Sequence, residues 1–331
     1  MMAIKNVLVC GCYGFVGAAT CHKLDKLGIR WYGIDDFSNN IEMTKFRREQ
    51  FSEDTQIRFT ENCSIDDSDI VHGGPWPERL PRFDAVIHLA ATPGVRQSIE
   101  DPYGYYHNNL MQTVYLLDLM REYKIPKLVF ASTSSIYDWD NAPYKPMSEL
   151  TQYIKPRHPY AGSKLAAEDL CRMYHELHGI SVSVLRYHTV YGPSGRPDMF
   201  PLKATKWICE GETIQLNGDG SQERDFTYID DVVDANIKAM NHKSGFEVFN
   251  VGSGMPYTLN ELIEFIAKYT GNHAKIKNNG TNNLDAGFTW ADNSKAEKML
   301  GWKPKRDLES GIWKTVDWYR ENRTVLKGIE F

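Results

Sequence analysis

A tyrosine and a lysine stand four positions apart at the start of a predicted helix, in the segment Tyr160-Ala-Gly-Ser-Lys164. An i, i+4 spacing places both side chains on one face of a helix. A nearby ammonium stabilises a phenolate, so the pKa of such a tyrosine can fall from about 10 toward neutrality. The pair can then serve in proton transfer as a general base. It can also be an ordinary pair on an exposed helical turn, so the rest of the sequence must decide.

Four consecutive hydroxyl side chains, Ser132-Thr133-Ser134-Ser135, follow a predicted buried strand at residues 127–131. In an open α/β sheet, ligands bind beyond the carboxyl ends of the strands. A hydroxyl at this position could hydrogen-bond the substrate oxygen that Tyr160 deprotonates. The alternative is a polar loop that caps the strand end.

Three glycines lie between the first predicted strand and the first predicted helix, in Gly11-Cys-Tyr-Gly14-Phe-Val-Gly17. Gly11 permits a tight turn, Gly14 lets the backbone approach a pyrophosphate, and Gly17 lets the helix pack against the strand. The free N–H groups at the helix start then hold the phosphates. Glycine turns are common, but this strand–turn–helix context favours a dinucleotide site over a plain turn. The residues expected to contact the dinucleotide are Gly11, Tyr13, Gly14, Phe15, Val16 and Gly17.

An aspartate, Asp35, ends the second predicted strand, roughly 20 residues after the glycine loop. A carboxylate there accepts hydrogen bonds from a ribose 2′-hydroxyl and repels a 2′-phosphate, so NAD is favoured over NADP. Arg47 and Arg48 could hold a 2′-phosphate, but they are expected to lie well along a helix. The alternative for Asp35 and Asp36 is a solvated turn.

The elements that position these residues alternate between short apolar strands and longer helical patterns. Apolar runs without alternation indicate strands covered on both faces, as in a parallel sheet. The sequence therefore predicts an α/β protein with a Rossmann-type, doubly wound parallel sheet. Strands are expected at residues 7–10, 31–34, 57–59, 85–89, 127–131 and 182–185, and helices at 16–27, 105–123 and 160–178.

After residue 185 the pattern changes to shorter elements separated by loops rich in Gly, Pro and Asp. We expect a smaller C-terminal lobe that binds the substrate, with residues 1–185 as the dinucleotide-binding domain and 186–331 as this lobe. The boundary is expected to be soft, with some later segments returning to the sheet. The polar, Asn-rich stretch 273–287 is expected to be a loop. Helices are expected near residues 198–210, 229–241, 258–270 and 310–322.

The 331 residues are 42% hydrophobic and 24% charged, with a net charge of −5. This is ordinary globular composition, and the length favours about two domains. No basic stripe indicates nucleic-acid binding, and no apolar run approaches the ~18 residues of a membrane span. The six cysteines form no CxxC pair, so neither a metal site nor a disulfide scaffold is expected. Without a recognisable signal peptide, we expect a cytoplasmic enzyme of small molecules.

Further motifs surround these residues along nearly the whole chain. They are His88-Leu89-Ala90-Ala91, Tyr105-Tyr106-His107-Asn108-Asn109, Thr133-Ser134-Ser135-Ile136-Tyr137, Arg186-Tyr187-His188-Thr189-Val190-Tyr191-Gly192-Pro193 and Arg224-Asp225-Phe226-Thr227-Tyr228-Ile229-Asp230-Asp231. Together with the glycine loop and Tyr160/Lys164, they resemble the extended short-chain dehydrogenase/reductase family of nucleotide-sugar epimerases and dehydratases. The resemblance implies that Tyr160, Lys164 and Thr133 are catalytic. It also implies that Leu89, Ala90, Ala91, Asn108, Tyr160 and Lys164 contact NAD.

Within this family the chain is most similar to UDP-glucuronate 4-epimerases, through Pro93-Gly-Val-Arg96, the Thr-Ser-Ser triplet and Gly195-Arg196-Pro-Asp-Met. The resemblance implies oxidation of the sugar at C4 with tightly bound NAD, rotation of the 4-keto sugar and reduction on its other face. It implies a UDP-sugar as the substrate, with residues of both the sheet and the lobe 186–331 binding it. Residues implied to contact it are Pro93, Arg96, Thr133, Ser134, Ser135, Tyr160, Thr189, Arg196 and Arg224, with Ser134, Ser135, Thr189 and Arg196 around the sugar carboxylate and Arg224 at the diphosphate.

Two serines argue against related activities. In sugar-nucleotide 4,6-dehydratases an Asp-Glu pair follows the catalytic Thr, whereas Ser134 and Ser135 stand here. UDP-glucuronate decarboxylases have Thr-Ser-Glu, and Ser135 replaces that Glu. The alternatives are a 4-epimerase of another UDP-hexose, a UDP-glucuronate decarboxylase, or a catalytically silent NAD-binding regulator.

The chain also departs from the family pattern. Cys10 and Cys12 flank Gly11 where Thr and Ala are usual, and Asp138 replaces a usual Gly. Cys63-Ser64 replaces an Asp that faces the adenine, and residues 282–285 lack the usual Arg and Gly of the diphosphate grip. The family pairs helices into a homodimer, which here implies an interface on helices 105–123 and 160–178 with Leu116, Leu117, Leu119 and Met173.

Overall fold

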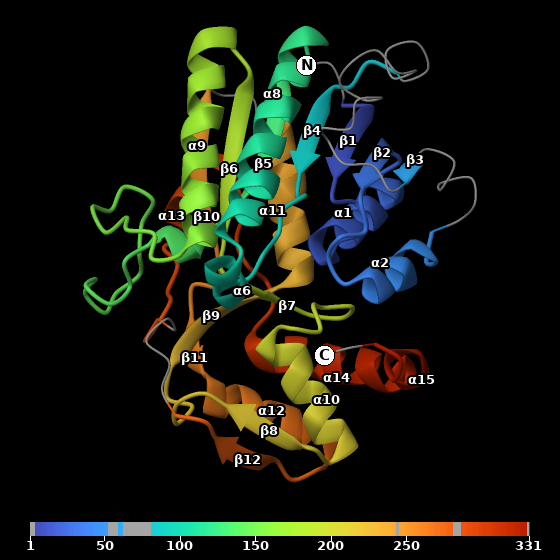
Figure 1. Ribbon diagram of the computed structural model, residues 1–331, viewed down its shortest axis with the longest axis vertical. Coiled ribbons are helices and arrows are strands. Elements are labelled where there is room, and N and C mark those ends of the chain that lie inside the picture. The colour runs from blue at the N-terminus through green and yellow to red at the C-terminus, as the bar shows by residue number, and fades with distance from the viewer. Residues whose placement is uncertain (1–3, 52–58, 62–80, 243–244, 281–285, 330) are drawn as a thin grey trace. The chain divides into compact units, whose positions relative to one another are not determined.

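The structure is a computed structural model that describes residues 4–51, 59–61, 81–242, 245–280, 286–329 and 331 (Figure 1). The departures expected at Cys63-Ser64 and at residues 282–285 lie outside the described residues. Of the predicted strand 57–59, only Phe59 is described, and it begins a strand that continues to Glu61.

A seven-stranded sheet forms the centre of the N-terminal part, in the order β10-β6-β5-β4-β1-β2-β3. The pairs β1–β2, β2–β3, β1–β4 and β4–β5 are parallel. The chain starts in the interior of the sheet and winds outward in both directions, which confirms the doubly wound, Rossmann-type prediction. The strands are β1 (Asn6–Cys10), β2 (Arg30–Asp35), β3 (Phe59–Glu61), β4 (Ala85–His88), β5 (Lys127–Thr133), β6 (Ser181–Tyr187) and β10 (Phe246–Val251).

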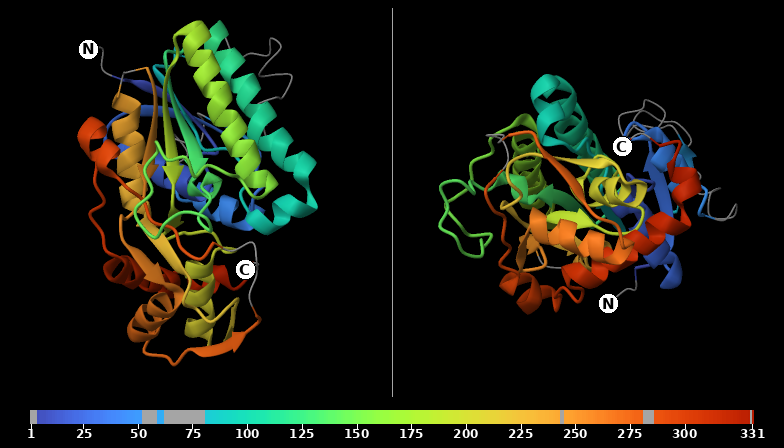
Figure 2. Two further views of the ribbon diagram at one scale, coloured as in Figure 1. Left: turned by 90° about the vertical axis from the view of Figure 1, so that its left-hand side faces the viewer. Right: turned by 90° about the horizontal axis from the view of Figure 1, so that it is seen from below.

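Helices cover both faces of this sheet (Figures 1 and 2). Two helices, α8 (Gln112–Glu122) and α9 (Pro159–His178), lie side by side over one face, and α11 (Ile229–Asn241) lies on the other. The Asn236 side chain on α11 donates to Thr20 Oγ1 on α1 (Phe15–Lys26) at 3.1 Å, so these two helices are neighbours. The strands are therefore buried on both faces, as their continuous apolar runs require.

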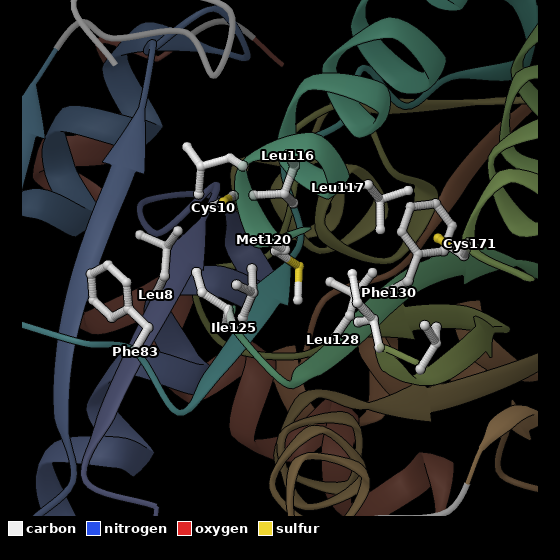
Figure 3. Close-up of a cluster of buried hydrophobic side chains, with 14 of the residues drawn as sticks. Leu8, Cys10, Phe83, Leu116, Leu117, Met120, Ile125, Leu128, Phe130 and Cys171 are labelled. Carbon is white, nitrogen blue, oxygen red and sulfur yellow. The ribbon is translucent and has the colours of Figure 1, made fainter. Parts of the chain in front are cut away.

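The core under α8 and α9 contains side chains from five strands and both helices, and Figure 3 shows part of it. Leu8, Leu128 and Phe130 from the sheet pack with Leu116 and Met120 from α8. Three residues predicted for a dimer interface, Leu116, Leu117 and Leu119, are 0%, 0% and 5% exposed in this core. That prediction was wrong for them, because helical periodicity marks an apolar face without saying what covers it.

The predicted helix 105–123 is divided into three consecutive helical pieces. They are α7 (Pro102–Tyr106), a π-helical turn (His107–Met111) and α8. A π turn places one extra residue in the helix, and such turns are frequent at functional sites. The other helices of this part are α2 (Ile41–Arg48) and α6 (Val95–Glu100).

The chain forms two compact units that exchange segments, rather than dividing once after residue 185. The first unit contains Met1–Tyr137, Ile154–Arg186 and Val233–Phe249, and the second contains Asp138–Tyr153, Tyr187–Val232 and Asn250–Phe331. The chain returns to the first unit because α11 packs on the sheet and β10 pairs with its β6 edge. Segments after residue 185 thus belong to both units, on either side of the soft boundary expected at 185/186.

The second unit has two small sheets, in the orders β11-β9-β7 and β12-β8. The stretch 273–287 was expected to be a loop, but Lys275–Asn278 forms β12, which pairs in parallel with β8. All four residues of β12 are exposed, so backbone pairing rather than an apolar pattern makes this strand. The elements are β7 (Thr189–Tyr191), α10 (Phe200–Glu210), β8 (Thr213–Leu216), β9 (Glu223–Tyr228), β11 (Pro256–Thr258), α12 (Leu259–Thr270), β12, α13 (Ser294–Leu300), α14 (Leu308–Glu321) and α15 (Arg323–Leu326).

None of the described helices combines the length and the apolar character needed to cross a membrane. Within the same part of the chain, no three or more His, Cys, Asp or Glu side chains gather as metal ligands.

A lysine is buried at the start of β5. Lys127 is 2% exposed, and its Nζ donates to Ser183 Oγ at 2.7 Å. Burial lowers the pKa of this ammonium from its ordinary 10.5 to about 7. The folded protein therefore holds this proton less tightly than the unfolded chain does.

Replacing this lysine should stabilise the protein, most strongly at low pH. Below pH 7 Lys127 is charged in both states, so the cost of burying the charge is complete. Between pH 7 and 10.5 only the unfolded chain holds the proton, so the free energy of unfolding rises with pH. Lys127→Met should raise that free energy by roughly 2 to 4 kcal/mol near pH 6, with the gain shrinking toward pH 10. Urea denaturation at several pH values tests this, and a gain independent of pH would contradict it. Lys45→Met, at an exposed position on α2, is the matched control.

Candidate active site

The glycine loop leaves its backbone open because side chains do not fit there. Gly11 has φ +78°, and a Cβ on it would lie 2.7 Å from the backbone nitrogen of Ala90. A Cβ on Gly17 would lie 1.9 Å from the carbonyl oxygen of Gly11, so α1 packs directly on the loop. Gly14 is the N-cap of α1, and no side chain caps its first N–H groups. These residues fit a pyrophosphate, which needs free N–H groups and close backbone approach.

Asp35 lies at the end of β2, beside this loop. Its carboxylate accepts from the backbone N–H of Tyr13 at 2.9 Å and from that of Phe37 at 3.0 Å. Burial raises the pKa of Asp35, and these two N–H groups oppose that effect. Arg47 on α2 is 4% exposed, and it donates to the carbonyl oxygen of Tyr13 at 3.4 Å. The guanidinium predicted as an alternative phosphate ligand therefore supports the loop from within the fold.

The segment after β4, which contains Leu89, Ala90 and Ala91, is held by the π-helical turn. Asn108 donates to Thr92 Oγ1 at 2.9 Å, and Asn109 exchanges hydrogen bonds with the Thr92 backbone. Asn109 also donates to Ser163 Oγ on α9 at 3.1 Å. The π turn thus connects this segment to the helix that carries Tyr160. The next residue of the segment, Pro93, accepts from Tyr105 at 2.9 Å, whereas Arg96 is exposed on α6.

Tyr160 lies in the first turn of α9. The turn begins with His158, whose side chain accepts from the Ala161 N–H, and with Pro159 at the first helical position. Pro fits there because its missing N–H would have no partner in the helix. The Tyr160 ring is stacked on His158 and meets Tyr105 edge-on, with centroids 6.0 and 6.3 Å away. These two rings fix the direction of the phenol.

Lys164 is buried one turn after Tyr160, at 2% exposure. Its Nζ lies 4.1 Å from the centre of the Phe130 ring, a cation–π contact. Burial lowers the pKa of this ammonium to about 8, against the opposing effects of Cys171 and Glu168. Burial and the charge of Lys164 also lower the pKa of His88 to about 3, so this histidine is neutral at physiological pH. Lys164 follows Tyr160 by four residues, so its buried ammonium lies on the same face of α9 as the phenol.

The hydroxyl residues form a tight turn at the carboxyl end of β5. Thr133 ends the strand, and its Oγ1 accepts from the Ser135 N–H at 3.1 Å. Thr133 and Ser134 are buried, and Ser135 is half-buried. Because α9 packs against both β5 and this turn, the first unit brings the hydroxyl residues to the helix of Tyr160 and Lys164.

Sequence reasoning missed an ion pair in this unit. Glu168 on α9 and Arg186 on β6 form a buried pair, with Nη2–Oε2 at 2.6 Å. A signal was present, because Glu168 follows Lys164 by four residues and therefore shares its helix face.

The remaining predicted substrate residues lie in the second unit. Thr189 begins β7, and Arg196 lies in the following loop, where its guanidinium pairs with the Asp198 carboxylate. Arg196 also lines a small pocket with Val190, Tyr191, Gly192, Gly195, Met199, Pro201 and Leu202. Arg224 lies on β9, and its Nη1 donates to the carbonyl oxygen of Glu223 at 2.8 Å.

Asp225, the neighbour of Arg224, holds three segments of the second unit together. It is fully buried, and its carboxylate accepts from the backbone N–H groups of Ser253, Gly254 and Ala291. The segment that carries Arg224 is therefore fixed by its own neighbour, a role that the motif alone does not reveal.

The comparison with known proteins decides the family. The sequence model of a protein family, the NAD dependent epimerase/dehydratase family, matches residues 7–252 of this chain. The chain belongs to this family.

Curated and solved relatives match over almost the full chain. A UDP-glucuronate 4-epimerase of Thermodesulfobacterium geofontis is 39% identical over 98% of this chain and 98% of its own. A crystal structure of UDP-glucuronic acid 4-epimerase from Bacillus cereus, with UDP-glucuronic acid and NAD, is 33% identical, covers 96% of this chain and 99% of its own, and has a TM-score of 0.85. A crystal structure of UDP-glucose 4-epimerase from Thermotoga maritima, with UDP-glucose, is 30% identical, covers 96% and 100%, and also has a TM-score of 0.85.

Family membership confirms the predicted NAD cofactor and the predicted class of enzyme, an NAD-dependent epimerase or dehydratase. The glycine loop and Asp35 fit NAD on the geometry described above. The residues that would hold it are those of the loop, Asp35, the segment 89–91 and Asn108.

Two departures from the family pattern are now explained by burial, and one is not. Cys10 and Cys12 are both fully buried, and burial raises the pKa of each thiol. They therefore act as small apolar side chains beneath the loop. Asp138 is buried in the second unit, where its Oδ2 accepts from Asn141 at 2.8 Å, and nothing in the structure explains why an acid stands there.

Proposed function

We propose that this protein is a UDP-sugar 4-epimerase and that its substrate pair is UDP-glucuronate and UDP-galacturonate. The observation that carries the proposal is the turn Thr133-Ser134-Ser135, which offers hydroxyls and no carboxyl group beside the helix of Tyr160 and Lys164. A dehydratase needs an acid and a base at those positions, so elimination of water has no proton carriers. The relatives support the 4-epimerase class, but they include epimerases of both UDP-glucuronate and UDP-glucose.

The proton chemistry falls to three residues of the first unit. Tyr160 takes the proton of the sugar 4-hydroxyl, and the buried ammonium of Lys164 stabilises the phenolate. Thr133 donates a hydrogen bond to the same sugar oxygen. NAD bound at the glycine loop would supply the hydride acceptor and donor at C4. Tyr160 then returns the proton after the 4-keto sugar has turned over.

The acid group of the substrate determines the remaining roles. An ionised carboxylate in a closed site must be paired or hydrogen-bonded. We assign this task to Ser134, Ser135, Thr189 and Arg196, the residues that the family resemblance implies around the sugar carboxylate. Pro93 and Arg96 are assigned to the sugar and Arg224 to the diphosphate. A 4-keto glucuronate is a β-keto acid that can lose CO₂, so hydroxyls and an arginine must hold the carboxylate out of alignment with the ketone.

The central experiment is to incubate the purified protein with a panel of UDP-sugars without added NAD and to identify the products by proton NMR. UDP-galacturonate from UDP-glucuronate is expected, because the cofactor is regenerated in every turnover. A pentose product with released CO₂ would instead identify a decarboxylase. No turnover of any UDP-sugar would indicate a silent NAD-binding protein.

Removal of the Tyr160 hydroxyl should abolish turnover without releasing NAD. Tyr160→Phe should lower kcat by ~10²- to 10⁴-fold, the usual contribution of a general base. The NAD content of the purified protein, measured after denaturation, should not change. Tyr103→Phe, at a residue that is 80% exposed, is the matched control. Substantial residual activity of Tyr160→Phe would contradict the assignment of the base.

Arg196 should distinguish acidic from neutral sugars. Arg196→Ala should lower kcat/KM for UDP-glucuronate by ~10- to 100-fold, the value of a hydrogen bond to a charged group. The value for UDP-glucose, if the protein turns it over at all, should change by less than about threefold. Arg30→Ala, at an exposed arginine on β2, is the control. Equal losses for both sugars would indicate a neutral hexose as the natural substrate.

We also propose a homodimer formed through α8 and α9. Met173 and Leu177 are 42% and 74% exposed, and their i, i+4 spacing on α9 makes one apolar surface strip. Leu177→Asp should convert the protein to a monomer in light scattering. Leu27→Asp, at a leucine 48% exposed at the end of α1, should not. A monomeric wild-type protein would overturn the proposal.

A further inference from the structure

The Glu168–Arg186 ion pair lies in the first unit, and both side chains are 5% exposed. Arg186 Nε donates to both carboxylate oxygens of Glu168, at 3.0 and 3.3 Å, and Nη2 donates to Oε2 at 2.6 Å. This multidentate geometry holds both side chains in a single arrangement. The pair joins helix α9 to strand β6.

The same two side chains also hold both ends of the hydroxyl turn. On one side of Thr133, Ser132 donates a short hydrogen bond to Glu168 Oε1. On the other side, Arg186 Nη1 donates to the Tyr137 hydroxyl at 3.0 Å, and the guanidinium carbon lies 5.2 Å from the centre of the Tyr137 ring. The turn that contains Thr133, Ser134 and Ser135 is thus attached before and after its functional hydroxyls.

The helix register connects this pair to the proton chemistry. Tyr160, Lys164 and Glu168 follow one another at intervals of four residues, so they form one row along α9. Glu168 therefore links helix α9 to the start of the turn through its hydrogen bond from Ser132. Arg186 on β6 fixes the Glu168 side chain in this position through the ion pair. Glu168 also acts on Lys164 electrostatically, because burial lowers the pKa of the Lys164 ammonium and the negative charge of Glu168 raises it.

We propose that the Glu168–Arg186 pair is a positioning clamp that sets the Thr133 hydroxyl at its working distance from the Tyr160 hydroxyl. The inference rests on the proposed function only in requiring that both hydroxyls meet one sugar oxygen. The clamp touches neither substrate nor cofactor. It acts through Ser132 and Tyr137, and it serves any UDP-sugar that the enzyme epimerises.

Stability alone does not account for such a pair. Replacing a buried ion pair with apolar residues of similar volume is often neutral or stabilising, because desolvation of the two charges costs about as much as their attraction returns. A core at this position could therefore be built without charges. What apolar residues cannot supply is a set of directed hydrogen bonds to Ser132 and Tyr137.

The test separates stability from positioning by removing both charges together. Glu168→Leu/Arg186→Met should keep the melting temperature within ~5 °C of wild type, yet lower kcat at least ~10-fold with KM changed less than about threefold. The single variant Glu168→Gln, which leaves Arg186 without its charged partner, should lower the melting temperature more than the double variant does. Recovery of kcat to the wild-type value in the double variant would overturn the proposal.

A double-mutant cycle shows whether the clamp acts through Thr133. In a Thr133→Ala background, Glu168→Leu/Arg186→Met should lower the remaining kcat by less than about threefold, because the positioned hydroxyl is already absent. An equal loss in both backgrounds would overturn the proposal. The control is Arg172→Met/Glu176→Leu, which removes an exposed pair with a 2.9 Å contact from the same helix and should leave kcat unchanged.

The kinetics are measured with a UDP-sugar that the wild-type protein epimerises in the panel. If UDP-glucuronate fails and another UDP-hexose is turned over, the proposed substrate is rejected, and the comparison of clamp variants proceeds with that hexose. NAD content is measured for every variant, so that a lost cofactor is not mistaken for a displaced hydroxyl.

Discussion

The close approach of Gly17 to the carbonyl oxygen of Gly11 is the constraint on which the proposed NAD site depends. There is no room for a single methyl group at this point, so α1 starts directly against the loop that follows β1. The uncapped first turn of α1 therefore lies directly after the carboxyl end of β1. It also brings the Tyr13 N–H to the Asp35 carboxylate, which aligns the end of β2 with the same edge. The proposed cofactor site is thus formed mainly by backbone, at glycines where a side chain would not fit.

The hydroxyl and phenol half of the site is built in the opposite way, from side chains in a crowded interior. Lys164 is buried against Phe130, and Glu168 and Arg186 are buried against Ser132 and Tyr137. Each charge has a partner or an aromatic face, as burial requires. These contacts tie α9 to two strands and to the turn between Thr133 and Tyr137. The residues proposed for the proton chemistry therefore lie on elements that are joined by several buried contacts.

Short sequence patterns predicted those features of the site whose geometry is set by residues close together in the chain. The glycine spacing, Asp35 and the four-residue interval from Tyr160 to Lys164 each fix a backbone or helix geometry on their own. The Glu168–Arg186 pair was missed because its two members are joined only by the tertiary fold. Leu116, Leu117 and Leu119 were assigned to the wrong surface because an apolar stripe fits a core and an interface equally well. The exposed strand β12 was missed because its pairing involves only the backbone.

The interleaving of the two compact units has a consequence for folding during synthesis on the ribosome. Strand β10 completes one edge of the large sheet, yet its residues follow the whole of the segment Tyr187–Val232, which belongs to the second unit. During synthesis the edge of β6 therefore stays unpaired while the segment Tyr187–Val232 leaves the ribosome. An unpaired strand edge is a template for association with other chains. The nascent chain is thus most exposed to aggregation after β6 has formed and before residue 251 has left the ribosome.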